Sequence, residues 1–193
     1  FLYFSISLLA VFWFIFSIFL FRNKLELLSS IHFDNNSLRL LVIAGFYSSL
    51  LLLAQTNEIN HLLIFIIIVN TSLADICAYL VGSRFGKTPL LKNISPNKTL
   101  EGFLGGIAAS SLFGFLMYYE YQLTASMLLI IIFSSFYAFV GDYFMSYLKR
   151  KSSLKDTGSI LPGHGGILDR IDSHLSATTI FTFLFILIQT LGI

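Results

Sequence analysis

The stretch TASMLLIIIFSSFYAFVGDYFMSYL, from Thr124 to Leu148, is almost entirely apolar and ends directly before Lys149 and Arg150. A membrane hydrocarbon core of about 30 Å is crossed by roughly 20 apolar residues in an α-helix. The stretch meets that length, and lipid offers no partner for unpaired backbone groups, so a helix is the natural conformation. We therefore predict a transmembrane helix that reaches water at its basic end.

Five further apolar blocks resemble this one. We predict a single membrane domain over residues 1–193, an all-α polytopic transmembrane bundle of about six helices at Phe1–Phe21, Leu38–Ala54, His61–Val81, Leu100–Tyr119, Thr124–Leu148 and Leu175–Ile193. Only 11% of the residues are charged and 56% are hydrophobic, whereas a soluble domain carries charge on about a quarter of its residues. The composition therefore excludes a soluble domain. Short alternating segments typical of a transmembrane barrel are not seen.

The basic residues follow a regular pattern along these blocks. All 12 Lys and Arg residues fall on every second connection, the three that follow the first, third and fifth blocks. The connections at 55–60 and 120–123 and the C-terminal end carry none. The positive-inside rule makes the three basic connections cytoplasmic.

Two acids lie within apolar blocks. A carboxylate at membrane depth is costly unless it faces a cavity, a cation or a metal. For Asp75, an interhelical hydrogen bond and a functional role are equally good interpretations. Asp142 lies one to two turns before Lys149, near the cytoplasmic end of its helix, where a metal or ligand can reach it, and we favour a functional role.

The second basic connection, Gly82–Thr99, ends in a turn signal, Ser95-Pro96-Asn97. Asn97 or Thr99 can cap the helix that follows, and Glu101 suits its first turn. A helix N-terminus beside Lys98 is also a ready anion site, although a plain cap in a solvated basic loop is a fair alternative. The glycines of the next block predict close approach of another helix; they are Gly102, Gly105 and Gly106.

The third basic connection is the segment SYLKRKSSLKDTGSILPGHGGILDRID, from Ser146 to Asp172. Its five cations can neutralise a polyphosphate, and the turn at 162–166 lets backbone N–H groups approach a ligand. Asp169 and Asp172 face the same way on a helix, and Mg²⁺ uses such carboxylates together with substrate phosphates. A headgroup-binding basic loop explains the cations, but neither the paired aspartates nor the glycines. His164 between glycines favours a functional role, such as a hydrogen bond to phosphate.

This segment resembles the signature of the phosphatidate cytidylyltransferases (CDP-diacylglycerol synthases). The matching residues are Ser146, Lys149-Arg150, Lys155-Asp156, Pro162, His164-Gly165-Gly166 and Asp169-Arg170-Ile171-Asp172, all at the family's spacings. Upstream, Asp75, Ala78-Tyr79, Gly82, Phe85-Gly86-Lys87, Ser95–Thr99 and Glu101-Gly102 resemble other common blocks of the family. The resemblance covers roughly Asp75–Ser173. Because family members have more transmembrane helices and the chain starts at Phe1, we expect further N-terminal helices in the full-length protein.

The resemblance implies an enzyme that uses Mg²⁺ and CTP to convert phosphatidate to CDP-diacylglycerol and pyrophosphate. It implies a bacterial inner-membrane protein whose active site faces the cytoplasm, and no nucleic-acid partner; a second cation and a homodimer stay open. The implied metal ligands are Asp142, Asp169 and Asp172. The implied catalytic residues are these three with Lys155, Asp156, His164 and Arg170. The implied nucleotide- and phosphate-binding residues are Ser95, Asn97, Lys98, Thr99, Lys149, Arg150, Gly165 and Gly166.

Two other functions stay open from the sequence. A related enzyme acting on another lipid, such as a CDP-archaeol synthase or a CTP-dependent lipid-alcohol kinase, shares the same phosphate chemistry. A non-catalytic anion carrier or lipid-binding scaffold belongs to a different class. Incorporation of labelled CTP into lipid separates the enzymes from the scaffold.

Overall fold

A computed structural model gives the fold of the chain. It describes residues 2–22, 36–55, 60–92, 94–154, 157–158 and 166–192, apart from the side chains of 36–39 and 60. These residues form six helices and one short hairpin: α1 (Leu2–Phe21), α2 (Asn36–Gln55), α3 (Asn60–Phe85), β1 (Pro89–Leu91), β2 (Ser95–Thr99), α4 (Leu100–Glu120), α5 (Ala125–Lys151) and α6 (Leu168–Leu191).

The predicted all-α membrane bundle is confirmed, and every predicted helix has a counterpart. Five of the helices in the described part of the chain are long and apolar enough to cross a membrane. The sixth, α2, has a shorter apolar part, Leu40–Gln55. Two predicted ends were wrong, since α3 continues past Val81 to Phe85 and α6 begins at Leu168 instead of Leu175. Hydropathy finds only the apolar run, whereas helical hydrogen bonding continues through the polar turns at its ends.

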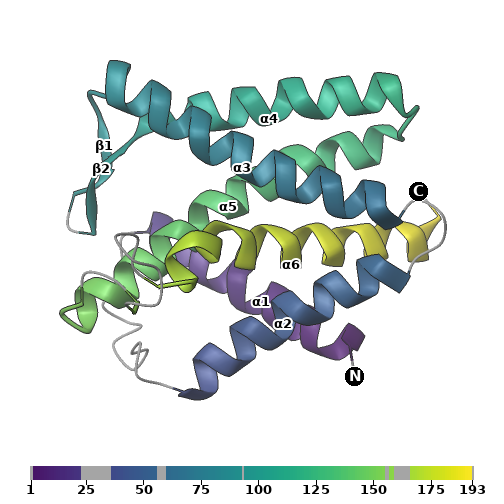
Figure 1. Cartoon of the computed structure of the whole chain (residues 1–193), viewed down its shortest axis with the longest axis horizontal. Helices are drawn as coiled ribbons and strands as arrows, with labels where there is room; N and C mark the ends of the chain where they lie inside the picture. The colour runs from purple at the N-terminus through teal and green to yellow at the C-terminus, as the bar shows by residue number, and fades with distance from the viewer. Residues whose placement is uncertain are drawn as a thin grey trace.

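The helices are arranged around a central pair (Figure 1). Helices α5 and α6 lie in the middle, with α3 and α4 on one side and α1 and α2 on the other. Burial agrees with this view. In the apolar 18-residue stretch of each helix, 61% of the residues are buried in α5 and 56% in α6, against 28% in α3 and in α4. The central pair therefore forms the core against which the outer helices pack.

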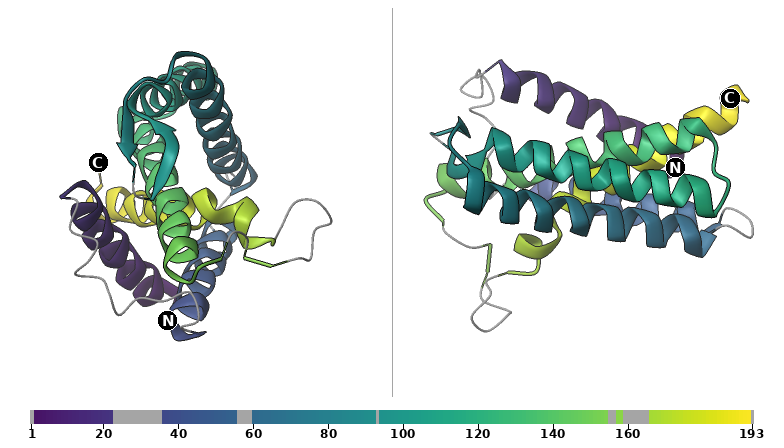
Figure 2. Two further views of the ribbon diagram at one scale, coloured as in Figure 1. Left: turned by 90° about the vertical axis from the view of Figure 1, so that its left-hand side faces the viewer. Right: turned by 90° about the horizontal axis from the view of Figure 1, so that it is seen from above.

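The two ends of the bundle differ in character (Figure 2). The hairpin, the C-terminal end of α5 and the N-terminal end of α6 lie together at one end, and both chain termini lie at the other. The first end holds the basic last turn of α5, residues Lys149, Arg150 and Lys151. This placement agrees with the alternation of basic connections along the sequence.

An aromatic cluster attaches α1 to α5. Trp13 is fully buried, and its ring meets those of Phe12 and Phe144 edge-on, with centroids 5.1 and 5.2 Å apart. Phe16 contacts Phe144 in the same manner at 4.9 Å. Edge-to-face geometry is favourable because the positive edge of one ring meets the negative face of the other.

Helices α3 and α4 approach so closely that their backbones are in contact. A Cβ atom on Gly102 would lie 2.6 Å from the Ala78 carbonyl oxygen, and one on Gly106 would lie 2.8 Å from the Ala74 carbonyl oxygen. Within lipid, small residues favour helix association because they permit this dispersion contact. The predicted packing role of these glycines is confirmed, and α3 is the partner helix.

A buried polar cluster also joins α3, α4 and α5. The Asn70 side chain is fully buried and donates to the Ile131 carbonyl at 3.0 Å and to Ser134 Oγ at 3.2 Å. The Ser110 hydroxyl donates to Asn70 Oδ1 at 2.6 Å. Such bonds add specificity to packing that dispersion alone leaves loosely defined.

The segment predicted as a connecting loop contains the hairpin. Strands β1 and β2 pair antiparallel, with Leu91 opposite Ser95, in a ribbon too short to show an alternating pattern in the sequence. The predicted cap is confirmed for Thr99, whose hydroxyl accepts the Gly102 N–H at 3.2 Å. The Glu101 carboxylate accepts the backbone N–H groups of Lys87 and Thr88, at 3.1 and 3.2 Å. These bonds attach the hairpin to the first turn of α4.

The contact between α3 and α4 gives a stability prediction. We expect Gly106→Val to destabilise the protein by roughly 1–3 kcal/mol, because the added atoms would overlap the α3 backbone. Thermal unfolding in detergent measures the effect. Ala108→Val, at an exposed position of the same helix, is the control, and equal melting temperatures for the two variants would contradict the packing argument.

Candidate active site

A cavity of about 750 Å³ lies between α3, α4, α5, the hairpin and the start of α6. Four aspartates from three helices line it: Asp75 of α3, Asp142 of α5, and Asp169 and Asp172 of α6. The polar strand β2 completes the wall, through Ser95, Asn97, Lys98 and Thr99 among others. Acids from distant parts of the sequence therefore meet in one chamber.

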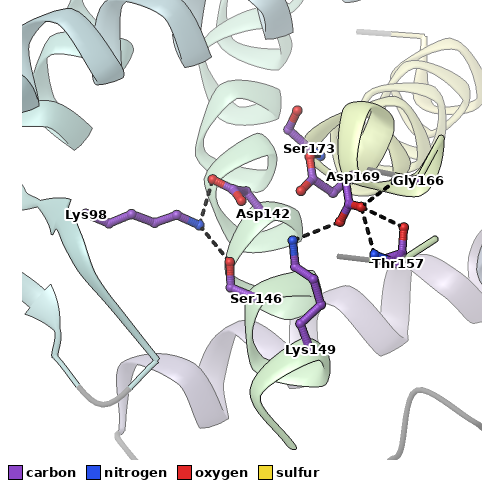
Figure 3. Close-up of polar contacts among 9 residues, drawn as sticks. Lys98, Asp142, Ser146, Lys149, Thr157, Gly166, Asp169 and Ser173 are labelled. Carbon is purple, nitrogen blue, oxygen red and sulfur yellow. Dashed lines mark hydrogen bonds and ion pairs between the residues drawn. The ribbon is translucent and has the colours of Figure 1, made fainter. Parts of the chain in front are cut away.

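Lys98 extends from the hairpin toward α5 (Figure 3). Its Nζ lies 2.6 Å from Asp142 Oδ2 and donates to Ser146 Oγ at 3.3 Å. The same ammonium group lies 4.4 Å from the ring centroid of Tyr143, which is fully buried. A cation over an aromatic face is attracted by the ring quadrupole. Three residues of α5 thus fix the position of Lys98.

Asp169 is held by four polar contacts at the start of α6 (Figure 3). Oδ1 pairs with Lys149 Nζ at 2.9 Å. Oδ2 accepts the backbone N–H and the hydroxyl of Thr157, at 2.8 and 2.9 Å, and the N–H of Gly166 at 3.0 Å. The carboxylate organises the segments that flank it, because it satisfies donors from both 157 and 166.

Ser173 holds the two remaining aspartates. Its hydroxyl, on a residue only 2% exposed, donates to Asp75 Oδ2 at 2.6 Å, and its backbone N–H donates to Asp172 Oδ1 at 2.9 Å. Asp172 lies close enough to both Asp75 and Asp142 for the like charges to repel. The interhelical hydrogen bond foreseen for Asp75 is present, and Asp75 also lines the cavity, so the two interpretations hold together.

The sequence carried signals for some of these positions. Asp142, Ser146 and Lys149 are spaced by four and three residues, so they share one face of α5. Gly141 faces α6, where an added Cβ atom would lie 2.6 Å from the Asp172 carbonyl oxygen. This glycine brings the two acid-bearing helices together. Ser173 and Tyr143 were not predicted as site residues, and only their tertiary contacts identify them.

The predicted site residues divide into four groups. Those that line the cavity are Asp142, Asp169, Asp172, Ser95, Asn97, Lys98 and Thr99. Arg150 and Arg170 are exposed and do not line the cavity. Lys149 and Gly166 do not line it either, but each donates a hydrogen bond to Asp169, which does. The Gly166 N–H, predicted to face a ligand, is bonded to that carboxylate instead. Lys155, Asp156, His164 and Gly165 lie outside the described residues.

The charges of the cavity bear on the predicted magnesium ion. Within the described ranges, no three His, Cys, Asp or Glu side chains are arranged to hold a metal by themselves. Among the described residues, four carboxylates line the cavity, and Lys98 and Lys149 pair with two of them, Asp142 and Asp169. Mg²⁺ commonly takes one or two carboxylates and completes its shell with water and substrate phosphates. The hard oxygen donors of these carboxylates fit such an ion.

Proteins from three bacteria resemble this chain. A phosphatidate cytidylyltransferase of Aquifex aeolicus is 40% identical over 141 residues, 70% of this chain and 52% of the relative. Proteins with the same name from Bacillus subtilis and Helicobacter pylori strain J99 are each 46% identical, over 113 and 105 residues. These matches cover 57% and 53% of this chain, and 42% and 39% of the relatives. The chain spans about half or less of the length of these curated relatives.

The sequence profile of the cytidylyltransferase family matches residues 2–188, nearly the whole chain. The match includes all four cavity aspartates and both paired lysines. It agrees with the resemblance seen in the segment from Ser146 to Asp172. The chain therefore belongs to the cytidylyltransferase family.

Proposed function

We propose that the protein transfers the cytidylyl group of CTP to phosphatidate, forming CDP-diacylglycerol and pyrophosphate. The observation that carries this proposal is the convergence of Lys98, Asp142, Asp169 and Asp172 on one cavity at the basic end of a membrane bundle. The relatives' shared name, phosphatidate cytidylyltransferase, supports this choice of nucleotide and lipid over the other lipid acceptors.

The reaction is an in-line displacement at phosphorus. A phosphate oxygen of phosphatidate forms a bond to the α-phosphorus of CTP, and the bond from that phosphorus to the oxygen bridging to the β-phosphate breaks. The electron pair leaves with pyrophosphate. The attacking oxygen is already anionic, so no strong base is required. The main obstacle is repulsion between two anionic substrates, which positioned cations offset.

The side chains of the cavity have distinct roles in this mechanism. Lys98 supplies positive charge beside Asp142 and Lys149 beside Asp169, and each can exchange its carboxylate partner for a phosphate oxygen. Asp142, Asp169 and Asp172 would hold Mg²⁺, which supplies Lewis-acid stabilisation of phosphate charge when bound. Ser173 keeps Asp75 and Asp172 oriented toward the cavity. A second cation and a homodimer stay predictions.

The location of the cavity suits two substrates of opposite solubility. The positive-inside rule favours a cytoplasmic position for the end of the bundle that carries the cavity and the basic turn of α5. CTP would enter from the cytoplasm, while phosphatidate would present its headgroup at the interface with its tails in the bilayer. We therefore propose an inner-membrane enzyme whose site faces the cytoplasm.

The first test of this function removes one carboxylate charge. We expect Asp169→Asn to lower CTP turnover with phosphatidate by at least about 100-fold, because the amide is a poor Mg²⁺ ligand and cannot pair with Lys149. Assays with purified protein across a range of Mg²⁺ concentrations measure this. Glu120→Gln, at the far end of α4, is the matched control. Near wild-type turnover in Asp169→Asn would refute the metal assignment, and no labelled lipid from the wild type would refute the reaction.

The second test concerns the hairpin. Replacing Lys98 by Met should raise the KM for CTP by roughly ten-fold or more, since one charge-assisted hydrogen bond contributes about 1.5–3 kcal/mol. Lys92→Met changes an exposed lysine of the same hairpin that does not line the cavity, and its kinetics should stay normal. An equal KM for both variants would show that Lys98 does not contact the nucleotide.

The third test concerns Ser173. We expect Ser173→Ala to lower turnover about ten-fold, because Asp75 loses the hydroxyl that orients it, and Ser173→Thr to restore much of the loss. Ser176→Ala removes another buried hydroxyl of α6, one that bonds the Tyr137 carbonyl at 2.5 Å. It should lower thermal stability while leaving turnover near the wild-type value. An equal fall in turnover for both alanine variants would mean that Ser173 acts only on stability.

A further inference from the structure

We propose that an apolar groove between α4, α5 and α6 holds one acyl chain of the lipid substrate and thereby sets chain-length preference. The inference rests on the proposed function. The groove has a volume of about 530 Å³, and its lining is apolar except for Ser126. The main side chains are Ile107, Leu129, Phe133, Phe136, Leu184 and Ile188.

The groove adjoins the aspartate-lined cavity. Ile107 lines both spaces. Beside it, the ring of Phe103, which lines the cavity, contacts Phe139 of the cavity at 4.7 Å and Phe136 of the groove at 6.1 Å. A molecule that lies across this boundary would meet charged groups on one side and, apart from Ser126, apolar groups on the other. Phosphatidate has the same order, an anionic headgroup followed by apolar chains.

Distances along α5 match the reach of an acyl chain. With a rise of about 1.5 Å per residue, Phe136 lies about 9 Å, and Leu129 about 20 Å, from Asp142 along the helix axis. A chain in a bilayer spans one half of a core of about 30 Å. If the phosphate lies at Asp142, the headgroup and glycerol cover the first part of this distance, so a long chain would pass Phe136 and Phe133 and end near Leu129, whereas an eight-carbon chain would stop before it.

The groove would affect which lipids are turned over more than how tightly a lipid binds. Lipid tails are as apolar as these side chains, so moving a chain from the bilayer into the groove changes its environment little. The consequence lies in orientation, because a chain fixed in the groove directs its headgroup into the cavity. Blocking the far part of the groove should therefore reduce turnover of long-chain lipid by a modest factor and spare short-chain lipid.

A pair of leucine substitutions tests this. Leu129→Trp fills the far part of the groove, and Leu112→Trp places the same bulk on α4, outside both spaces, at similar exposure (67% and 63%). Turnover of dioleoyl and of dioctanoyl phosphatidate is measured for each. We expect the long-to-short turnover ratio to fall about five-fold or more in Leu129→Trp and to stay at the wild-type value in Leu112→Trp. An unchanged ratio in Leu129→Trp, or an equal fall in both variants, would overturn the proposal.

A capture experiment tests the groove independently of turnover. Phosphatidate with a diazirine near the end of one acyl chain is irradiated with the protein, and labelled residues are mapped by mass spectrometry. The proposal is supported by label at 129–136 or 184–188 that disappears when excess dioleoyl phosphatidate competes for the site. The same label should persist when the competitor is dioleoylglycerol. Label that neither lipid removes indicates bulk lipid and overturns it. If the wild type converts neither lipid, the proposed function fails. The pattern of label then tests by itself whether the groove binds an acyl chain.

Discussion

Carboxylates inside a bundle of apolar helices require polar partners, and this requirement governs how the helices meet. An ionised carboxylate in hydrocarbon is costly unless it is paired or hydrogen-bonded. Each of the four cavity aspartates has a partner: Asp142 has Lys98, Asp169 has Lys149 and Thr157, and Ser173 serves both Asp75 and Asp172. Most of these partners come from another element, so satisfying the acids also fixes α3, α5, α6 and the hairpin relative to one another.

Close helix contact makes this convergence possible. Gly102 and Gly106 let α4 touch the α3 backbone, and Gly141 does the same between α5 and α6. A bulkier residue at any of these positions would push apart helices that line the cavity. The short hairpin then supplies a cation from outside the helices. Lys98 extends from it into the chamber, where Tyr143 and Ser146 hold its ammonium group in place.

The same arrangement would allow one fold to serve the two proposed substrates. Charged groups gather at the end of the bundle that carries the basic turn of α5, where the proposed nucleotide would bind. Beyond Ile107 the lining becomes apolar. A change from charged to apolar lining across two adjoining spaces is the complement of an amphipathic lipid, and it would place the phosphate of such a lipid beside the acids and lysines.

The sequence by itself determined the membrane class, the number and approximate positions of the helices, the grouping of the basic connections and seven of the residues that line the cavity. It could do so because hydropathy, charge placement and the spacing of Asp142, Ser146 and Lys149 are properties of a single helix or connection. The early start of α6, the hairpin and the pairing of Lys98 with Asp142 depended on tertiary structure. So did the role of Ser173, which lies 98 positions from Asp75. Contacts between residues so far apart are decided by how helices pack, and no local pattern in the chain records which faces will meet.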